Sequence, residues 1–509
     1  MKKLIILASF FSLLTGCKKE YFDVGPTGST DESAIFATTG NASNVISGIY
    51  RYLYSRYDAQ NTPGHGGVML MLDFMGEDVH QAVASWYTPG NGTGGWVNHR
   101  NASYAYTGYP FRLYYRCIGN ANGLIDNIDN AVGPDNDKKR LKAEALTMRA
   151  WAYFNLVQIY AKRYDATSVP NTQLGVSMPL TALETQLPRS TVEEVYTQIN
   201  KDLADAIAAF ATASSPPSGP QSKSHLTARA AWAIRAKVAL VMQDWVKAAE
   251  YAKQVVDMGG SSLMSNAQYQ AGFNDLSNPE WIWGAYVQDD QGDTFGSYFG
   301  QISWDGNTTY IRGTPKRINS ALYAQITATD VRKKMWEPSP NSTNFPLPAS
   351  NYSYSPYMSR KFKIRSLPTI GDVPYIRLAE MYLIMAEAYA RTPGKEAEAK
   401  QALFTLAKNR DPNYVLSTNT GQALIDEILF HRRVEFWAEG LRFFDLKRLN
   451  LPLDRTAVPN YVPASAGGTM QIAAGTNLWQ FVIPISEIQA NPNTVQRILY
   501  PDTLSGCYR

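Results

Sequence analysis

Hydrophobic positions recur along most of this chain with the spacing of amphipathic helices. Between residues 34 and 54, for example, Val45, Ile49 and Leu53 fall on one helical face. The short apolar run 278–287 instead favours a strand. The chain is therefore predicted to be mostly α-helical, and the same spacing predicts further helices over 111–130, 139–161, 190–210, 226–257 (as two helices), 374–391, 395–410 and 422–449.

A start signal supports one of these helices. Ser190 and Glu193 have the spacing of a capping box, which opens the helix that reaches about Phe210. The Pro- and Ser-rich segment 211–224 then predicts a linker or surface loop.

Some of the predicted helices resemble tetratricopeptide pairs. In 244–256 and 380–404, alanines recur at positions where two helices must approach closely. The period of about 34 residues that marks such repeats is not regular here, so an irregular all-α bundle remains an alternative. The predicted fold is an irregular α/α superhelix of tetratricopeptide-like helix pairs, with long loops and a few short strands.

Two long stretches have no helical period, about 58–110 and 260–370. They are rich in Gly and Asn, and they hold many of the aromatic residues, which make up 12% of the chain and include 31 tyrosines. Long irregular segments in compact domains are often functional. Tyr and Trp expose an apolar ring together with a polar group, which suits the faces of sugar rings or the backbone of peptides. We therefore expect these stretches to form a ligand-binding face.

The first residues predict export and lipid attachment. Lys2 and Lys3 precede an apolar run over residues 4–14, and small residues lead to Cys17. This is the pattern of a bacterial lipoprotein signal, in which residues 1–16 are removed and the Cys17 thiol carries the lipid. The alternative is an ordinary cleaved signal with a chance cysteine. Residues 17–30 then read as a lipidated tether, and 31–509 as a single composite domain.

Charge and cysteine content exclude several classes of protein. The formal charge of +4 falls to +2 when Lys2 and Lys3 leave with the leader, whereas nucleic-acid binding needs a concentrated basic surface. We therefore expect no nucleic-acid partner. Beyond Cys17 there are only Cys117 and Cys507, too few for a disulfide framework, and the apolar surroundings of Cys117 predict a buried thiol.

The sequence lacks the motifs of the common catalytic sites. It has no His-Glu-x-x-His, no Gly-x-Ser-x-Gly and no phosphate-binding loop, and its five histidines are dispersed. Asp289, Asp290 and Asp293 lack the ligand alternation of a calcium loop. We predict a binding protein without cofactor or metal, not an enzyme. A surface glycoside hydrolase with paired carboxylates and a purely structural surface protein are the competing classes.

Five segments resemble the SusD/RagB family of surface nutrient-binding lipoproteins. Residues 21–36 and 41–53 resemble the part of the family that follows the lipidated cysteine. Residues 373–391 resemble its Ile-Arg-x-Ala-Glu helix, and residues 483–496 resemble its Pro-Ile-x-x-Glu-Ile ending. The chain departs from the family only in the C-terminal turn, where Arg497 and Ile498 follow Gln496. The most specific match is 428–450, whose matching residues are Arg432, Arg433, Glu435, Glu439, Gly440, Arg442, Phe444, Asp445, Leu446 and Arg448.

These matching residues are interpreted as structural. Arg432 and Glu435, like Arg442 and Asp445, are three positions apart and can meet on one helix face. Gly440 allows a helix to end or another segment to approach closely. We expect a buried charge network that orders the helical core.

The resemblance implies an outer-membrane lipoprotein on the cell surface. It implies a fold of tetratricopeptide-like helix pairs with an irregular ligand face. The implied partner is a SusC-like TonB-dependent transporter, over which the protein acts as a lid. The implied ligand is an oligosaccharide, or in other members a peptide.

The best candidates for ligand contact lie in 73–106 and 292–310. Aromatic residues there would stack on ligand and polar residues would set its orientation. The alternative for each aromatic residue is packing of the loop onto the helices. The candidates are Asp73, Trp86, Trp96, Asn98, Arg100, Tyr104, Tyr298, Trp304, Asp305, Asn307 and Tyr310.

Overall fold

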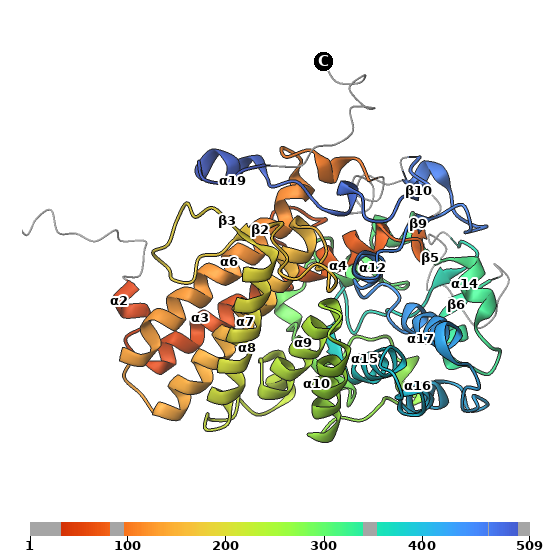
Figure 1. Cartoon of the computed structure of the whole chain (residues 1–509), viewed down its shortest axis with the longest axis horizontal. Helices are drawn as coiled ribbons and strands as arrows, with labels where there is room; N and C mark the ends of the chain where they lie inside the picture. The colour runs from red at the N-terminus through yellow and green to blue at the C-terminus, as the bar shows by residue number, and fades with distance from the viewer. Residues whose placement is uncertain (1–31, 82–95, 339–353, 467, 497–509) are drawn as a thin grey trace, which may run out of the picture.

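The computed structural model describes residues 32–81, 96–338, 354–466 and 468–496 of the 509-residue chain. Helices dominate it, as predicted (Figure 1). The longer helices are α3 (Thr39–Tyr52), α4 (Gly64–Phe74), α6 (Ala105–Asn127), α7 (Asp135–Tyr160), α8 (Val192–Phe210), α9 (Ala228–Val241), α10 (Trp245–Asp257), α15 (Leu378–Ala390), α16 (Glu396–Arg410) and α17 (Gly421–Glu435). The shorter ones are α2 (Glu32–Ile35), α11 (Asn266–Tyr269), α12 (Phe299–Ile302), α13 (Thr309–Arg312), α14 (Ser320–Gln325), α18 (Arg442–Arg448) and α19 (Ile485–Ala490).

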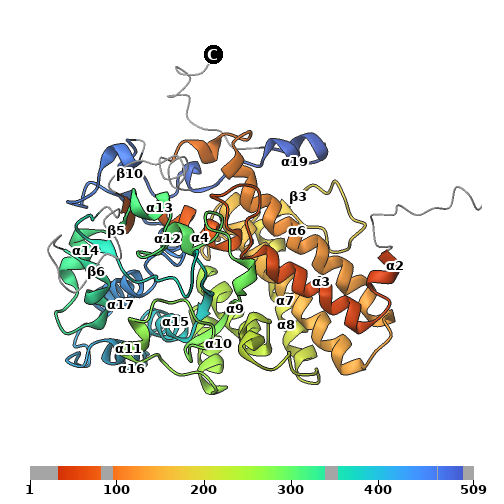
Figure 2. The same cartoon turned by 180° about the vertical axis from the view of Figure 1, so that it is seen from behind.

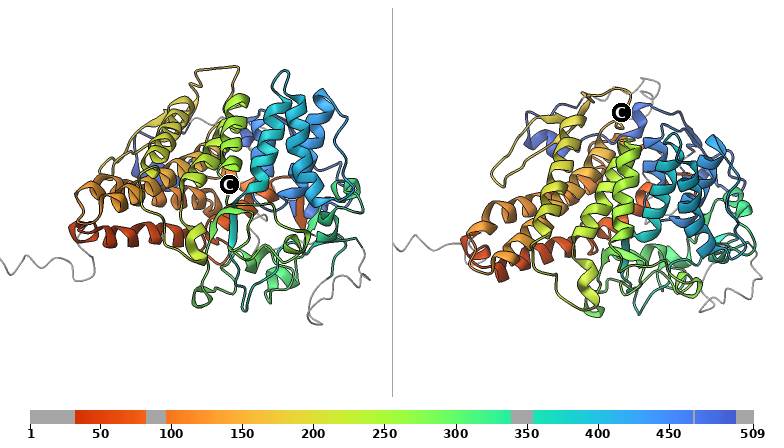
Figure 3. Two further views of the ribbon diagram at one scale, coloured as in Figure 1. Left: turned by 90° about the horizontal axis from the view of Figure 1, so that it is seen from below. Right: turned by 60° about the horizontal axis from the view of Figure 1, so that its bottom comes forward.

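Successive helices pack as antiparallel pairs. In the N-terminal half α6, α7 and α8 lie side by side, and α3 covers α6 on the face seen in Figure 2. Helices α9 and α10 form the next pair, and α10 packs on α15, which in turn packs on α16 and α17 (Figure 3). Helix α7 is buried almost throughout from Arg140 to Tyr160 because neighbours cover both of its sides. The predicted arrangement of tetratricopeptide-like helix pairs is confirmed.

The start of α8 differs from the prediction by one residue. Thr191, not Ser190, is the N-cap, and its hydroxyl accepts from the Glu194 backbone N–H while the Glu194 side chain bonds back to Thr191. Both pairs have the spacing of a capping box. Glu193 is engaged elsewhere, because its carboxylate accepts from the backbone N–H of Asn171 at 2.9 Å.

Short strands hold the loop-rich parts together. The strand predicted over 278–287 is β4 (Trp281–Ala285), which pairs antiparallel with β8 (Val373–Arg377). The helix predicted over 374–391 therefore begins only at Leu378, after that strand. The other strands are β1 (Val79–Gln81), β2 (Leu174–Ser177), β3 (Arg189–Thr191), β5 (Lys316–Ile318), β6 (Trp336–Glu337), β7 (Met358–Ser359), β9 (Leu453–Asp454) and β10 (Gln471–Ile472), with β1, β5, β7 and β6 forming one sheet in that order.

The helix predicted over 422–449 is two helices with a sharp break. Helix α17 ends at Glu435, and Ala438 (φ 62°) and Gly440 (φ 81°) turn the chain before α18. A Cβ at Gly440 would lie 2.8 Å from Met69, so glycine is required both for its φ and for the close approach.

The C-terminal segment returns to the N-terminal half. The backbone N–H groups of Phe481, Val482 and Ile485 donate to the carbonyls of Ile159, His99 and Ala102, respectively. Helix α19 consequently lies beside the start of α6, at the top of Figure 1. We call residues 479–488 the C-terminal strap.

The expected buried charge network exists, with different partners from those inferred. Arg432 pairs with Asp445 (2.8 Å) and Glu380 (3.3 Å) rather than with Glu435. Arg448 pairs with Asp445 at 2.8 Å. Burial alone would raise the pKa of Asp445, but the two arginines lower it to about 2.

The other charged residues of the two expected pairs, Arg442 and Glu435, form ion pairs with neighbouring elements. Arg442 pairs not with Asp445 but with Glu77, in the segment between α4 and β1. Glu435 accepts from Arg377, Arg410 and Arg332, all fully or almost fully buried. Each expected pair lies within one helix, α17 or α18, but oppositely charged side chains on neighbouring elements take its members as partners instead. Cys117 on α6 is a buried free thiol, as predicted, and Cys507 lies outside the described residues.

Candidate functional site

A groove lies beside α3. Figure 2 shows this helix at the front. Its walls come from α3 and the residues after it, from the short helix η4 (Pro220–Ser224) and from β4 and the residues after it. It offers about 390 Å³ to the centres of water molecules. Tyrosine rings, amides and hydroxyls predominate among the lining residues, which are Asn44, Ser47, Gly48, Tyr50, Arg51, Leu53, Tyr54, Gln221, Ser224, His225, Trp283, Gly284, Ala285, Tyr286, Gln288, Gln291 and Tyr375.

The charge of the groove wall is low. Among the described residues that line it, Arg51 is the one permanent charge, and none carries a carboxylate. Tyr54 and Tyr286 are half-buried, and Gln288 is exposed. A concave surface of this kind, with aromatic rings and amides that can donate and accept, suits a ligand rich in hydroxyl groups.

Hydrogen bonds fix one wall of the groove. The Tyr54 hydroxyl donates to Gln291 Oε1 at 2.6 Å, and the Tyr375 hydroxyl donates to the Leu53 carbonyl at 2.8 Å. These bonds hold the end of α3 against the segments that follow β4 and precede α15. Burial raises the pKa of both tyrosines, so their hydroxyls remain donors at neutral pH.

A buried glutamate holds the floor of the groove. Glu144 of α7 accepts from the Tyr50 hydroxyl at 2.5 Å, and His225 Nδ1 lies 3.0 Å from the same carboxylate oxygen. Arg140 donates to the other oxygen at 2.7 Å. Burial, followed by the charge of Glu144, raises the pKa of Tyr50 well above its ordinary value. The floor is therefore rigid and its tyrosine stays neutral.

The structure brings the two predicted loop stretches together next to the groove. The Tyr310 hydroxyl lies 3.4 Å from Gln60 Oε1, and the Gln301 side chain donates to the Gln60 carbonyl at 3.2 Å. Tyr104 packs on Tyr106 with ring centroids 5.6 Å apart. The second stretch begins at Gly292, directly after the groove residue Gln291.

Four of the predicted contact residues belong instead to the protein interior. Trp96, Tyr298 and Tyr310 are at most 2% exposed and present no open ring face in this structure. The Trp96 indole donates to the Met75 carbonyl at 2.9 Å and packs against Trp479 with centroids 4.7 Å apart. The Tyr298 hydroxyl donates to the Ala438 carbonyl at 2.9 Å.

Asp73 is the fourth of these residues and acts as a buried support for α18. Its carboxylate accepts from the backbone N–H groups of Gly440 (2.7 Å) and Arg442 (3.2 Å). Burial raises its pKa to about 7, against the opposing effect of these two donors. Asp73 therefore secures the break between α17 and α18 and is not available to orient a ligand.

The remaining candidates are accessible in different degrees. Asn98, Arg100, Tyr104, Trp304 and Asp305 are half-buried, and Asn307 is exposed. Asp305 accepts from the Ile364 backbone N–H at 2.9 Å, and burial raises its pKa. Trp86 and Cys17 lie outside the described residues.

Sequence reasoning missed the tyrosines of the groove. Tyr54 and Tyr286 lie just beyond the ends of α3 and β4, a helix and a strand that the sequence predicts, and neither tyrosine is among the predicted ligand contacts. Their signal was the density of tyrosine around the end of α3, at positions 50, 52, 54 and 57, which exceeds what one buried helix face requires.

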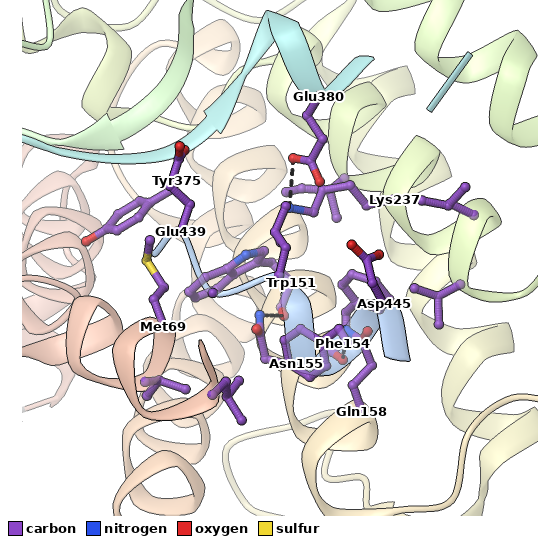
Figure 4. Close-up of a pocket in the computed structure, with 18 of the residues that line it drawn as sticks. Met69, Trp151, Phe154, Asn155, Gln158, Lys237, Tyr375, Glu380, Glu439 and Asp445 are labelled. Carbon is purple, nitrogen blue, oxygen red and sulfur yellow. Dashed lines mark hydrogen bonds and ion pairs between the residues drawn. The ribbon is translucent and has the colours of Figure 1, made fainter. Parts of the chain in front are cut away.

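A second, mostly buried cavity lies in the interior, between α4, α7 and α9 on one side and β8, α15, α17 and α18 on the other (Figure 4). It offers about 60 Å³ to the centres of water molecules. Both apolar side chains, such as Met69 and Phe154, and charged ones, such as Lys237 and Glu380, line it.

Within the ranges that the structure describes, no cluster of three or more His, Cys, Asp or Glu side chains could hold a metal ion. No helix in these ranges has the length and apolar character needed to span a bilayer.

Comparison with known proteins shows which protein family the chain resembles. Residues 44–240 match a family described as starch-binding associating with outer membrane, and residues 241–500 match the SusD family. The starch-binding protein SusD of Bacteroides thetaiotaomicron is 34% identical over 125 residues, which are 25% of this chain and 21% of that protein. The chain's match thus spans about a fifth of that relative's length.

Solved structures match over much more of the chain. A SusD-like carbohydrate binding protein from Bacteroides vulgatus is 26% identical, with a TM-score of 0.76 over 90% of this chain and 98% of that one. A SusD superfamily protein from Bacteroides thetaiotaomicron (23% identity, TM-score 0.75, 91% and 100% coverage) and a laminarin binding SusD-like protein (20%, 0.68, 91% and 100%) share the fold. Since the family match over residues 241–500 covers more than half of the sequence, the chain belongs to the SusD family.

Proposed function

We propose that this protein binds oligosaccharides at the cell surface and delivers them to a SusC-like TonB-dependent transporter in the outer membrane. The observation that carries the proposal is the groove beside α3, whose wall combines Tyr54 and Tyr286 with amides and hydroxyls and lacks a carboxylate. Two similar proteins support the ligand class, one described as starch-binding and one as carbohydrate binding.

The groove has the groups that a neutral sugar requires. The rings of Tyr54 and Tyr286 offer apolar faces, while Gln288 and Asn44 can donate to and accept from sugar hydroxyls. A charged peptide would gain less here, because a cationic side chain finds no acidic partner on the wall. Trp304, Asn307 and Tyr104 are proposed to extend the contact surface along the neighbouring loops.

Titration calorimetry with a panel of neutral oligosaccharides and of peptides tests this proposal. Stacking contributes about 0.5–1.5 kcal/mol beyond area burial, so Tyr286→Ala should weaken sugar binding by about 2- to 13-fold or more. The control is Tyr389→Ala, another half-buried tyrosine, on α15 outside the groove. Binding of peptides alone, equal effects of both variants, or enzymatic turnover of the bound sugar would each contradict the proposal.

The membrane anchor is proposed to be the lipid on Cys17. Cys17→Ala should release the protein from the outer membrane or block its maturation, because two or three acyl chains provide stable anchoring. Fractionation after an alkaline wash measures this. A Cys17→Ala protein that still resists the wash would rule out the anchor.

The transporter is tested by capture. A lid needs a broad interface, on the order of 2,000 Å² or more as in stable assemblies. Affinity capture of the tagged protein from outer membranes, solubilised in mild detergents, should recover a large barrel protein. Recovery of the lipoprotein alone in several detergents would count against this part of the proposal.

A further inference from the structure

A single side chain lies between the groove beside α3 and the interior cavity of Figure 4. Tyr375 of β8 lines both of these hollows, and within the described parts of the chain no other residue does so. Figure 4 shows its side chain among those that line the cavity. The wall between the groove and the interior is therefore one side chain thick at Tyr375.

Three contacts hold the side chain of Tyr375 in this wall. Its hydroxyl donates to the Leu53 carbonyl at 2.8 Å, and its ring lies edge-on to Trp283 with centroids 5.0 Å apart. Its ring also lies edge-on to His65, with centroids 5.1 Å apart. Leu53 and Trp283 line the groove, whereas His65 lines the cavity. The ring thus stands between the two hollows in a fixed orientation.

The neighbouring part of the wall is thicker. Trp283 on the groove side packs edge-on against Trp151 on the cavity side, with ring centroids 5.1 Å apart. Two indole rings separate the hollows there, so shortening one of them leaves the other in place. Tyr375 faces both hollows itself, and its ring alone decides whether they are connected at this point.

The interior cavity has surfaces that part of a sugar could contact. Met69, Leu72 and Phe154 contribute apolar side chains to its wall, and the ion pair between Lys237 and Glu380 (3.0 Å) contributes polar atoms. A sugar ring combines apolar faces with hydroxyl groups, which such a mixed wall can bind. In the native protein the ring of Tyr375 keeps a sugar in the groove out of this space.

We propose that Tyr375 determines the depth of the groove and thereby selects unbranched oligosaccharides. This inference rests on the proposed function and adds to it the shape of the ligand. A branch directed toward β8 meets the Tyr375 ring, which cannot move aside without losing its hydrogen bond to Leu53. An unbranched chain needs only the groove itself.

Thiol labelling tests whether Tyr375 closes the cavity. Met69→Cys places a thiol on the cavity wall, at a side chain that is 4% exposed. Adding Tyr375→Ala should speed the reaction of this thiol with N-ethylmaleimide by about tenfold or more, because thiol reactivity follows exposure. Adding Tyr375→Phe, which keeps the ring, should not speed it. Equal rates with Tyr375→Ala and with Tyr375→Phe would overturn the proposal.

The native thiol of Cys117 shows whether a variant is still folded. It is free and fully buried, and peptide mass spectrometry follows it separately from the introduced thiol. If Tyr375→Ala exposes Cys117, the comparison is made with Tyr375→Leu, which keeps an apolar side chain in the strand. Labelling of Cys117 in both variants would show that Tyr375 supports the whole core, and the proposal would fail.

Titration calorimetry tests the selection of ligands. The probes are maltotetraose and the same chain carrying one glucose branch on a primary hydroxyl. Tyr375→Ala should shift the ratio of their affinities by about tenfold or more toward the branched sugar, since a pocket that excludes an extra group discriminates by such factors. The control is Tyr389→Ala, a half-buried tyrosine that lines neither hollow, and it should leave the ratio unchanged.

Two results of the calorimetry have different meanings. If the native protein binds the branched sugar as tightly as the unbranched one, Tyr375 does not select and the proposal is overturned. If neither sugar binds to any of the three proteins, the proposed function loses support, whereas the labelling rates still decide whether Tyr375 separates the groove from the cavity.

Discussion

Glu435 is the most heavily used anion of the buried network. It accepts from Arg377 at 3.0 Å, from Arg410 at 3.0 Å and from Arg332 at 3.4 Å, and its own exposure is zero. Burial alone would raise the pKa of Glu435, but the three arginines hold it far below its usual range. Glu435→Gln removes one negative charge and keeps the shape of the side chain.

The expected loss of stability depends on the ion pairs that remain in Glu435→Gln. Breaking a buried ion pair typically costs about 3–5 kcal/mol, because the partner charge is left uncompensated. Here Glu280 still accepts from Arg377 and Arg410. We therefore expect the lower end, about 3 kcal/mol, or roughly a hundredfold in the unfolding equilibrium constant at 1.4 kcal/mol per factor of ten.

Urea unfolding followed by circular dichroism and by tryptophan fluorescence measures this change. The control is Asp205→Asn, which breaks the exposed Lys201–Asp205 pair (2.5 Å) and should leave the midpoint almost unchanged. If Glu435→Gln unfolds at the same midpoint as the control, the network contributes little to stability and its interpretation as the organiser of the core is refuted.

Two further predictions concern buried rings. Trp96→Ala should destabilise the fold by about 3–5 kcal/mol, since it leaves a cavity beside Trp479; a variant that instead loses ligand affinity at unchanged stability would restore Trp96 as a contact residue. Burial lowers the pKa of His80 and His99 to about 3, against about 6.5 when unfolded. Between these two pKa values the folded state binds fewer protons than the unfolded state, so the free energy of unfolding should decrease as the pH is lowered below about 6.5. At 1.36 kcal/mol per pKa unit, the decrease at pH 5 is about 2 kcal/mol per histidine. Unfolding free energies of the wild type and of His99→Gln at pH 7 and 5 check this, because the raised pKa of Asp73 has the opposite effect but acts equally in both proteins. The loss of stability at pH 5 should be smaller in His99→Gln; the same pH dependence in both proteins would show that His99 titrates normally.

The sequence predicted the helices well because their signal is local. The face of Val45, Ile49 and Leu53 is visible in a single helix, and α3 follows it. The strand β8 was missed because its partner, β4, lies about ninety residues earlier, and periodicity over 374–391 cannot show that pairing. The predicted N-cap of α8, Ser190, was one residue too early, because Ser190 and Thr191 are each followed three positions later by a glutamate.

The candidate site was harder to predict because burial is not local. Trp96 and Tyr298 sit in Gly-rich segments that suggest exposed loops, yet distant elements cover them. Trp479 and Ala438, which contact these two residues, are far away in the sequence. Tyr54 and Tyr286 face the same groove because the residues after α3 and those after β4 both line it, and neither segment alone reveals this arrangement.

The C-terminal strap has a consequence for how the chain must fold. His99 Nε2 bonds to the carbonyl of Leu478, the residue directly before the strap, at 2.9 Å across 379 positions, and Val482 of the strap adds a backbone bond to the same histidine. Contacts of such separation form late, since a long loop must close first. The segment around Trp96 therefore stays incomplete until synthesis has nearly finished. This part of the protein can therefore fold only after almost the whole chain has been synthesised. A protein shortened before residue 479 would leave an apolar surface exposed and would be prone to aggregate.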